Sequence, residues 1–163
     1  RPVGGVMVFA KTSKAAGRIS DMVRTHQFKK TYLAIVEGKV LDDGIFEDNL
    51  LKLEKENRTI VDKKGKYAKL SYKLIKYIDG LSLVKINLET GRSHQIRVQF
   101  SSRGFPLWGD QKYNKNAKVG EQIALWAYKI EFKHPITKEK EVFKCEPFWN
   151  EYPWILFGSD NFE

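Results

Sequence analysis

The chain has 163 residues and carries 29 Lys and Arg against 20 Asp and Glu, a formal charge of +9. Its 42% hydrophobic and 30% charged residues argue against a disordered chain, and the lack of any long apolar run argues against a membrane span. We expect one domain over residues 1–163, and the unevenly spread positive charge favours a polyanionic partner, with nucleic acid first.

The first part of the chain shows strand and helix patterns in turn. Residues 3–10 are typical of a strand, and Ser13 is expected to cap a helix whose apolar residues recur at helical spacing. A second strand is expected at 30–37, and the run 42–44, Asp-Asp-Gly, indicates a turn. The highly charged stretch 50–66 is expected to contain a hairpin tip.

The second part of the chain is dominated by strand patterns. Two candidates, 67–78 and 81–88, are joined at Asp79-Gly80, which is a strong signal for a tight hairpin. Further strands are expected at 123–133 and 141–145. Mostly antiparallel strands with two or three short helices predict an α+β fold.

The stretch 89–100 places two arginines, a histidine and two glutamines at a junction of strand and helix. Gly91 can adopt a positive φ, and Ser93 is a good N-cap. A helix that begins there directs free backbone N–H groups and cations at one spot, an arrangement that binds phosphate. We therefore expect Arg92 and His94 to contact phosphate or the backbone of a nucleic acid.

Five blocks of sequence carry motifs in a fixed order. The blocks are Arg1–Lys11, Lys30–Gly38, Gly91–Val98, Gly104–Tyr113 and His134–Thr137. Together they resemble the motifs of the RluA family of RNA pseudouridine synthases over most of the chain. The first block departs from the family, which usually has Thr-Ser-Gly where this chain has Val3-Gly4-Gly5.

The resemblance implies the pseudouridine synthase catalytic fold and an isomerase that converts specific uridines of ribosomal or transfer RNA to pseudouridine. It implies an aspartate as the nucleophile, with no metal and no organic cofactor. That aspartate is expected directly before Arg1, at the end of an Arg-Leu-Asp motif, so we expect the chain as printed to be inactive. RNA is the expected partner, and neither a membrane nor an obligate protein partner is expected.

The resemblance also implies roles for individual residues. Tyr32 is expected to stack on the target base and to serve in proton transfer, and Arg97 to pair with the catalytic aspartate. Ile96 is expected to pack on the uracil. Without the resemblance, these residues are interpreted as a core tyrosine, an exposed helix arginine and a core isoleucine. Substrate-binding residues are expected as follows: Arg92, His94, Lys11 and Lys30.

Other features leave alternatives open. A non-catalytic RNA-binding module of the same fold and an unrelated basic scaffold are the competing interpretations, and only the scaffold predicts behaviour insensitive to salt.

The aromatic residues at 148–157 favour core packing over base stacking. The single cysteine, Cys145, favours a reducing, cytoplasmic compartment and a buried position in a strand. Asp110 belongs to a motif block and is interpreted as structural.

Overall fold

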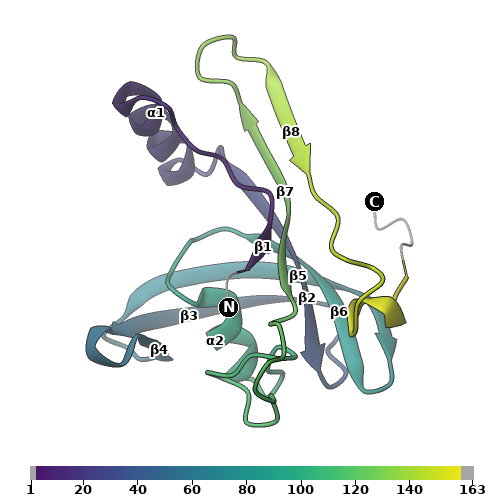
Figure 1. The fold of residues 1–163 in the computed structure, drawn as a ribbon. Helices are drawn as coiled ribbons and strands as arrows, with labels where there is room; N and C mark the ends of the chain where they lie inside the picture. Colours follow the sequence, from purple (N-terminus) through teal and green to yellow (C-terminus); the bar gives the residue numbers. More distant parts are fainter. Residues whose placement is uncertain (1–2, 159–163) are drawn as a thin grey trace.

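The computed structural model describes residues 3–158, so Arg1 and Pro2 of the first motif block lie outside the described residues. One sheet of eight strands runs in the order β1-β7-β2-β6-β5-β3-β4, with β8 paired to β7 (Figure 1). The bounds are β1 Gly4–Gly5, β2 Lys29–Glu37, β3 Asp43–Leu53, β4 Arg58–Val61, β5 Lys66–Ile78, β6 Leu81–Leu88, β7 Leu125–Lys133 and β8 Lys140–Lys144. Only β1 and β7 pair in parallel, and the predicted α+β fold is confirmed.

The sheet is centred on a hairpin that the sequence predicts. The strands β5 and β6 meet at Asp79 and Gly80, which have φ values of 51° and 80°. Two successive positive φ values are what a two-residue hairpin turn requires, which explains the Asp-Gly pair. The strand β2 pairs with β6 on one side and β7 on the other, and its central residues are buried on both faces.

Two strands were not predicted. The turn signal at 42–44 leads directly into β3, and the charged stretch 50–66 forms the end of β3, the 3-10 helix η1 (Glu54–Glu56) and β4. The long β3 has few buried residues, because one of its faces points to solvent and carries polar side chains. Its sequence therefore lacks the apolar run by which the other strands were recognised.

The predicted strand at 3–10 is wrong for most of its length, because only Gly4 and Gly5 pair with β7. A Cβ on Gly5, which has φ of 124°, would lie 2.2 Å from the carbonyl oxygen of Ala127. A Cβ on Gly4 would lie 2.3 Å from the ring of Trp126. The Trp126 ring thus occupies the space that a serine at position 4 would need, which explains the departure from Thr-Ser-Gly.

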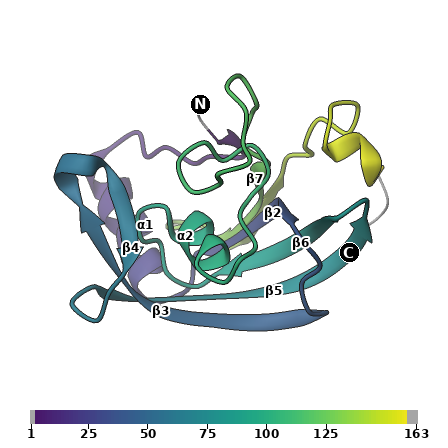
Figure 2. The same cartoon turned by 90° about the horizontal axis from the view of Figure 1, so that it is seen from below.

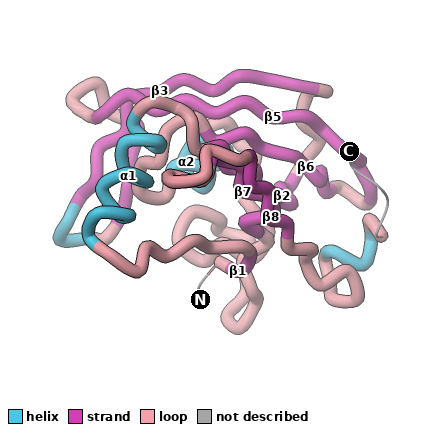
Figure 3. The backbone as a smooth tube through the Cα atoms, turned by 90° about the horizontal axis from the view of Figure 1, so that it is seen from above, coloured by secondary structure: helices cyan, strands magenta, loops and turns pink. Residues whose placement is uncertain are grey.

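The two α-helices differ in how they attach to the sheet. The first, α1 (Ser13–Arg24), has no buried residue, and Thr12 caps it by accepting the Ala15 N–H at 3.1 Å, so the predicted cap at Ser13 is wrong. The second, α2 (Gln95–Ser101), buries five of its seven residues against the sheet (Figure 2). Figure 3 shows α1 in front of the sheet and α2 behind it. Within residues 3–158, no helix has the length and apolar character to cross a membrane.

The core has one main cluster on each face of the sheet. The face that carries Ala34 packs against α2 and is called the α2 face. The opposite face, called the reverse face, carries Leu33 and packs against Trp154 of the 3-10 helix η2 (Trp154–Leu156). The prediction that the C-terminal aromatic residues pack in the core is right for Trp154 and Phe157, which are buried.

Two predictions about the C-terminal region are wrong. Phe148 and Tyr152 are exposed rather than part of the core, since their exposed fractions are 59% and 58%. Cys145 follows β8 directly and is half-buried, because the chain leaves the sheet at this point.

Candidate active site

The turn that leads into α2 is built differently from the prediction. The helix begins at Gln95, and its N-cap is His94 in a left-handed conformation with φ of 52°, so Ser93 is not the cap. Gly91 does not have a positive φ. A Cβ on Gly91 would lie 3.3 Å from Nζ of Lys30, so a glycine here leaves room for that ammonium group.

Arg97 of α2 is held by a buried carboxylate. Its Nε and Nη2 donate to the two carboxylate oxygens of Asp110 at 2.9 and 2.8 Å. Asp110 has no exposed surface and also accepts the backbone N–H groups of Lys112 and Tyr113. A bidentate charge-assisted pair fixes the plane of the guanidinium. Since a guanidinium has five N–H donors, three remain on Arg97 for a second anion.

Tyr113 connects Arg97 to the rest of the site. Its ring contacts the guanidinium groups of both Arg58 and Arg97, whose centres are 4.8 and 5.0 Å from the ring centroid. Its hydroxyl accepts the backbone N–H of Thr59 at 2.9 Å and lies 2.7 Å from Nδ1 of His94. The hydroxyl has one proton to donate, and it donates to Nδ1 when a neutral His94 carries its own proton on Nε2.

This environment changes the pKa of His94. Burial lowers the pKa of His94, and the nearby charges of Arg97 and Lys112 lower it further, so the ring is neutral near pH 7. The structure gives His94 the side chain of Tyr113 as its partner. His94 thus orders the Arg97 site in addition to any contact with substrate.

A cavity of about 590 Å³ opens beside this network. Its lining includes Val3, His94, Arg97, Asp110, Lys112 and Ile123. Val3 comes from the N-terminal segment, so the cavity is bounded on one side by α2 and on another by the start of the chain. Among the described residues, no three His, Cys, Asp or Glu side chains gather in a way that could hold a metal ion.

Tyr32 and Ile96 lie on the α2 face beside this cavity. Tyr32 is half-buried on β2 and packs, like Val3, against the core cluster that contains Ile96. Burial raises the pKa of Tyr32, so its hydroxyl stays protonated near pH 7 and can donate a hydrogen bond. The structure therefore places Tyr32 and Ile96 at one core cluster, and Ile123 of that cluster also lines the cavity of Arg97.

Three adjoining hollows form a groove that reaches the turn before α2, which we call the cation groove. The first hollow, lined by Ser71 and Asn87, shares Lys30 with the second. The second hollow, lined by Tyr67, shares Arg92 with the third, which Leu50 lines. Burial lowers the pKa of Lys30, and the Nε of Arg92 donates to the carbonyl of Tyr67 at 2.8 Å. Further cationic residues of the groove are Arg24, Lys29, Lys52, Lys64 and Lys66. Lys11, which precedes α1, is exposed and lines none of these hollows.

The sequence interpretation missed several residues that hold the site. Asp110 was recognised as structural but not as the partner of Arg97, and Tyr113 was not singled out. Gln95 and Gln99 form a buried chain in which Gln95 donates to Gln99 at 3.0 Å, and Gln99 donates to Asp48 at 2.9 Å. The signal for this chain was present, because two glutamines four positions apart on an apolar helix lie on one face.

Comparison with known proteins identifies relatives of the chain. The family of RNA pseudouridylate synthases matches residues 1–102. An uncharacterized RNA pseudouridine synthase of Bacillus subtilis, YhcT, is 36% identical over 139 residues, which cover 83% of this chain and 46% of that protein. The ribosomal large subunit pseudouridine synthase D of Zymomonas mobilis is 32% identical over 158 residues, which cover 90% of this chain and 50% of that protein.

A solved structure supports the fold. The human RNA pseudouridylate synthase domain containing 1 superposes with a TM-score of 0.72 at 21% identity, covering 85% of this chain and 62% of that chain. The chain spans about half the length of the curated relatives that it matches.

Proposed function

This chain belongs to the RNA pseudouridylate synthase family, and we propose that it forms the catalytic domain of an enzyme that converts specific uridines of ribosomal or transfer RNA to pseudouridine. We place this domain at residues 1–163 and the enzyme in the cytoplasm. The observation that carries the proposal is the cavity in which Asp110 orients Arg97 opposite Val3. The reaction detaches the base, turns it and rejoins it through carbon, so the product is an isomer of the substrate.

The nucleophile that we propose is an aspartate directly before Arg1. That position is three residues from Val3, and an extended chain advances roughly 3.3–3.6 Å per residue, so its Cα lies within about 11 Å of Val3. Val3 lines the same cavity as Arg97. The three donors that Arg97 does not give to Asp110 can hold such a carboxylate ionised and oriented.

We propose that Tyr32 and Ile96 handle the base. Both belong to the α2 face, where the Tyr32 ring offers a stacking surface and its protonated hydroxyl a donor. A uridine within folded RNA has to leave its stack to reach such a cavity. Lys30 and Arg92 of the cation groove, together with His94, are then the groups that bind the flanking phosphates. Lys11 is exposed before α1 and binds a more distant phosphate.

The test compares two polypeptides, one with Arg-Leu-Asp joined before Arg1 and one with Arg-Leu-Asn. Each is incubated with ribosomal and transfer RNA, and pseudouridine is measured by mass spectrometry of the digested nucleosides. RNA affinity is measured in parallel by fluorescence anisotropy. We expect both to bind RNA with affinity that falls steeply with salt, and only the aspartate form to make pseudouridine.

Two results contradict the proposal in different ways. If both polypeptides bind RNA and neither makes pseudouridine, the non-catalytic RNA-binding module becomes the better interpretation. If neither binds RNA at low salt, the substrate itself is wrong and the scaffold interpretation gains support.

A further inference from the structure

The third hollow of the cation groove lies directly beside the cavity of Arg97. Ser93 lines the hollow and the next residue, His94, lines the cavity, and the Cα atoms of two consecutive residues are about 3.8 Å apart. On β4, Thr59 lines the hollow, and Asn57, two residues earlier in the chain, lines the cavity. The two spaces therefore adjoin along both of these segments.

The boundary between the cavity and the hollow is held in place by Tyr113. Its hydroxyl accepts the Thr59 N–H at 2.9 Å and lies 2.7 Å from Nδ1 of His94, so it joins β4 to the turn before α2. The helix α2 also contacts β4 directly. The fold therefore fixes how far the hollow lies from the cavity.

The guanidinium of Arg92 is held through one nitrogen. Its Nε donates to the carbonyl of Tyr67 at 2.8 Å, and within residues 3–158 this is the only hydrogen bond of the Arg92 side chain. The four N–H groups on its two terminal nitrogens are therefore available to an anion. Since Arg92 is exposed and lines the third hollow, its guanidinium is an oriented donor for a phosphate bound there.

Lys64 and Lys66 add two cations to the same hollow. Both side chains are exposed, and among the described residues neither ammonium group has an ion pair or a hydrogen bond. Gly65, which lies between them, packs against β3, because a Cβ on it would be 2.3 Å from the carbonyl carbon of Leu50. A glycine at this position therefore lets the turn with the two lysines lie close to the hollow.

The carboxylates near the third hollow have other partners. Glu54 lines the hollow, but it forms an ion pair with Lys52 at 3.0 Å. Asp62 accepts the backbone N–H of Lys64 at 2.8 Å and does not line the hollow. The charges of the arginine and of the two exposed lysines therefore remain for a ligand.

The hollow has a size and a lining that suit a nucleotide. Its volume is about 440 Å³, within the range of about 300–1,000 Å³ that is common for small-ligand pockets. Leu50 and Leu51 give it an apolar part. The Ser93 hydroxyl makes no hydrogen bond within the part of the chain that the structure describes, so it can bind an oxygen of a sugar.

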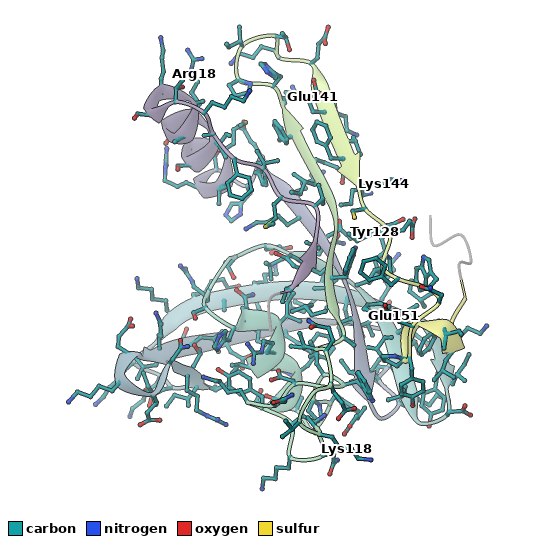
Figure 4. The ribbon with its side chains drawn as sticks, viewed as in Figure 1. Arg18, Lys118, Tyr128, Glu141, Lys144 and Glu151 are labelled. Carbon is teal, nitrogen blue, oxygen red and sulfur yellow. The ribbon has the colours of Figure 1, made fainter. Side chains whose placement is uncertain are left out.

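The hollow continues the cavity on the side of β4. Figure 4 labels Lys118 at the lower end of the molecule, and Val119, the next residue of that loop, lines the cavity but not the hollow. The cavity reaches from this loop to Asn57, and the hollow follows on β4 with Thr59. An RNA strand that occupies both spaces therefore crosses the turn before α2.

We propose that the third hollow is a nucleotide site, which binds the phosphate and the ribose of the RNA nucleotide directly next to the target uridine. The identity of the ligand rests on the proposed function. The uridine enters the cavity, and its neighbour is bound on the other side of the turn by Arg92, Lys64 and Lys66. Binding of this neighbour holds the strand over the turn, which stabilises the uridine outside its stack.

The test uses the double variant Lys64→Gln/Lys66→Gln and a matched control, Lys55→Gln/Lys63→Gln. The control removes two exposed lysines of the same region that do not line the hollow. The probe is a fluorescein-labelled RNA stem-loop whose only uridine lies in a loop of adenines, titrated at several KCl concentrations. The hollow variant is expected to bind about tenfold more weakly at low salt, with a slope of log affinity against log salt that is smaller by about 1. The control is expected to keep the native slope.

A second measurement locates the bound phosphate. Versions of the probe each carry one uncharged methylphosphonate, at one of the two linkages on either side of the uridine or, as a control, in the stem. At one of the four loop linkages, the substitution is expected to weaken binding by the native chain several-fold and to change binding by the hollow variant little, because the two partners of one contact do not act additively. The stem linkage is expected to affect both proteins equally.

Two results would overturn the inference. One is an equal change of salt slope in the two double variants, and the other is an equal effect of every loop methylphosphonate on the native chain and the hollow variant. In either case, RNA binding by the native chain still supports the proposed function. Absence of all RNA binding by the native chain removes both.

Discussion

The two charged regions of this molecule are built on opposite rules. Around Arg97, charged and polar groups have fixed partners, from the bidentate contact with Asp110 to the hydrogen bond between Tyr113 and His94. On the reverse face of the sheet, lysines face each other across neighbouring strands, since Lys73 lies opposite Lys85 and Lys129 lies opposite Lys144. These four residues are called the opposed lysines. The first arrangement fixes geometry, which a reaction needs. The second adds repulsion between neighbouring strands, which does not fix geometry. Substitutions should therefore lower stability markedly in the first region and change it little in the second.

The largest effect is expected from breaking the contact between Arg97 and Asp110. Asp110→Ala leaves a guanidinium without its partner, and Arg97→Ala leaves a fully buried carboxylate, so each should lower the free energy of unfolding by about 3–5 kcal/mol. The measurement is urea unfolding followed by tryptophan fluorescence. The double variant should lose less than the sum of the two single losses. Additive losses would show that the two side chains do not depend on each other.

A smaller effect is expected from Tyr113→Phe. This change keeps the ring that both guanidinium groups contact but leaves the Thr59 N–H and His94 without the hydroxyl. An unsatisfied buried polar group costs about 1–3 kcal/mol, and the same unfolding experiment measures it. Tyr67→Phe is the control, because that hydroxyl is bonded to Glu47 at the surface. Equal losses for the two variants would place the Tyr113 hydroxyl outside the supporting network.

Substitutions at the opposed lysines should change the free energy of unfolding little and in the other direction. Lys73→Gln/Lys85→Gln removes a like-charged pair, so the free energy of unfolding is expected to stay within about 0.5 kcal/mol or to rise slightly at low salt. Thermal unfolding at low and high KCl measures this, and added salt should narrow any gain because it screens repulsion. A marked loss of stability would mean that the lysines support the fold and would remove the contrast between the regions.

The smallest effect concerns pH. The folded protein lowers the pKa of His94 from its usual value of 6.5, so the unfolded chain binds a proton more readily. Stability from this group is thus fully present above about pH 6.5 and is lost as the pH falls through the range below it. His94→Gln should reduce the difference between urea midpoints measured at about pH 7.5 and about pH 5.5. An unchanged difference would assign the pH dependence to other groups.

The features that the sequence predicted well are those determined by residues close together in the chain. The turn at Asp79-Gly80 and the two strands beside it follow from local preferences, and the structure confirms them. The partner of Arg97 could not be found in this way, because Asp110 approaches through a loop and the contact depends on packing that no spacing rule describes. The strand β3 was missed because Gly44 and Asp48 on its inner face and the exposed Ile45 on its outer face break the alternation that marks a strand.

The same limit applies to the start of α2. Ser93 is the better cap by intrinsic preference. In the structure the N-cap is His94, which is held in a left-handed conformation where its ring contacts the Tyr113 hydroxyl. Tertiary contacts therefore decided the cap. The opposed lysines could not be recognised in the sequence either, because they are spread over four strands and only the register brings them together.

The short strand β1 has a consequence for how this protein can vary. Gly4 and Gly5 hold the N-terminal segment against β7 by having no side chain, since the ring of Trp126 and the carbonyl of Ala127 fill the places where Cβ atoms would lie. At Gly5 the atoms in the way belong to the backbone of Ala127, so no other residue fits there unless the N-terminal segment moves. At Gly4 the obstacle is one side chain, so a serine becomes acceptable once Trp126 is smaller. The two positions 4 and 126 should therefore change together among orthologues.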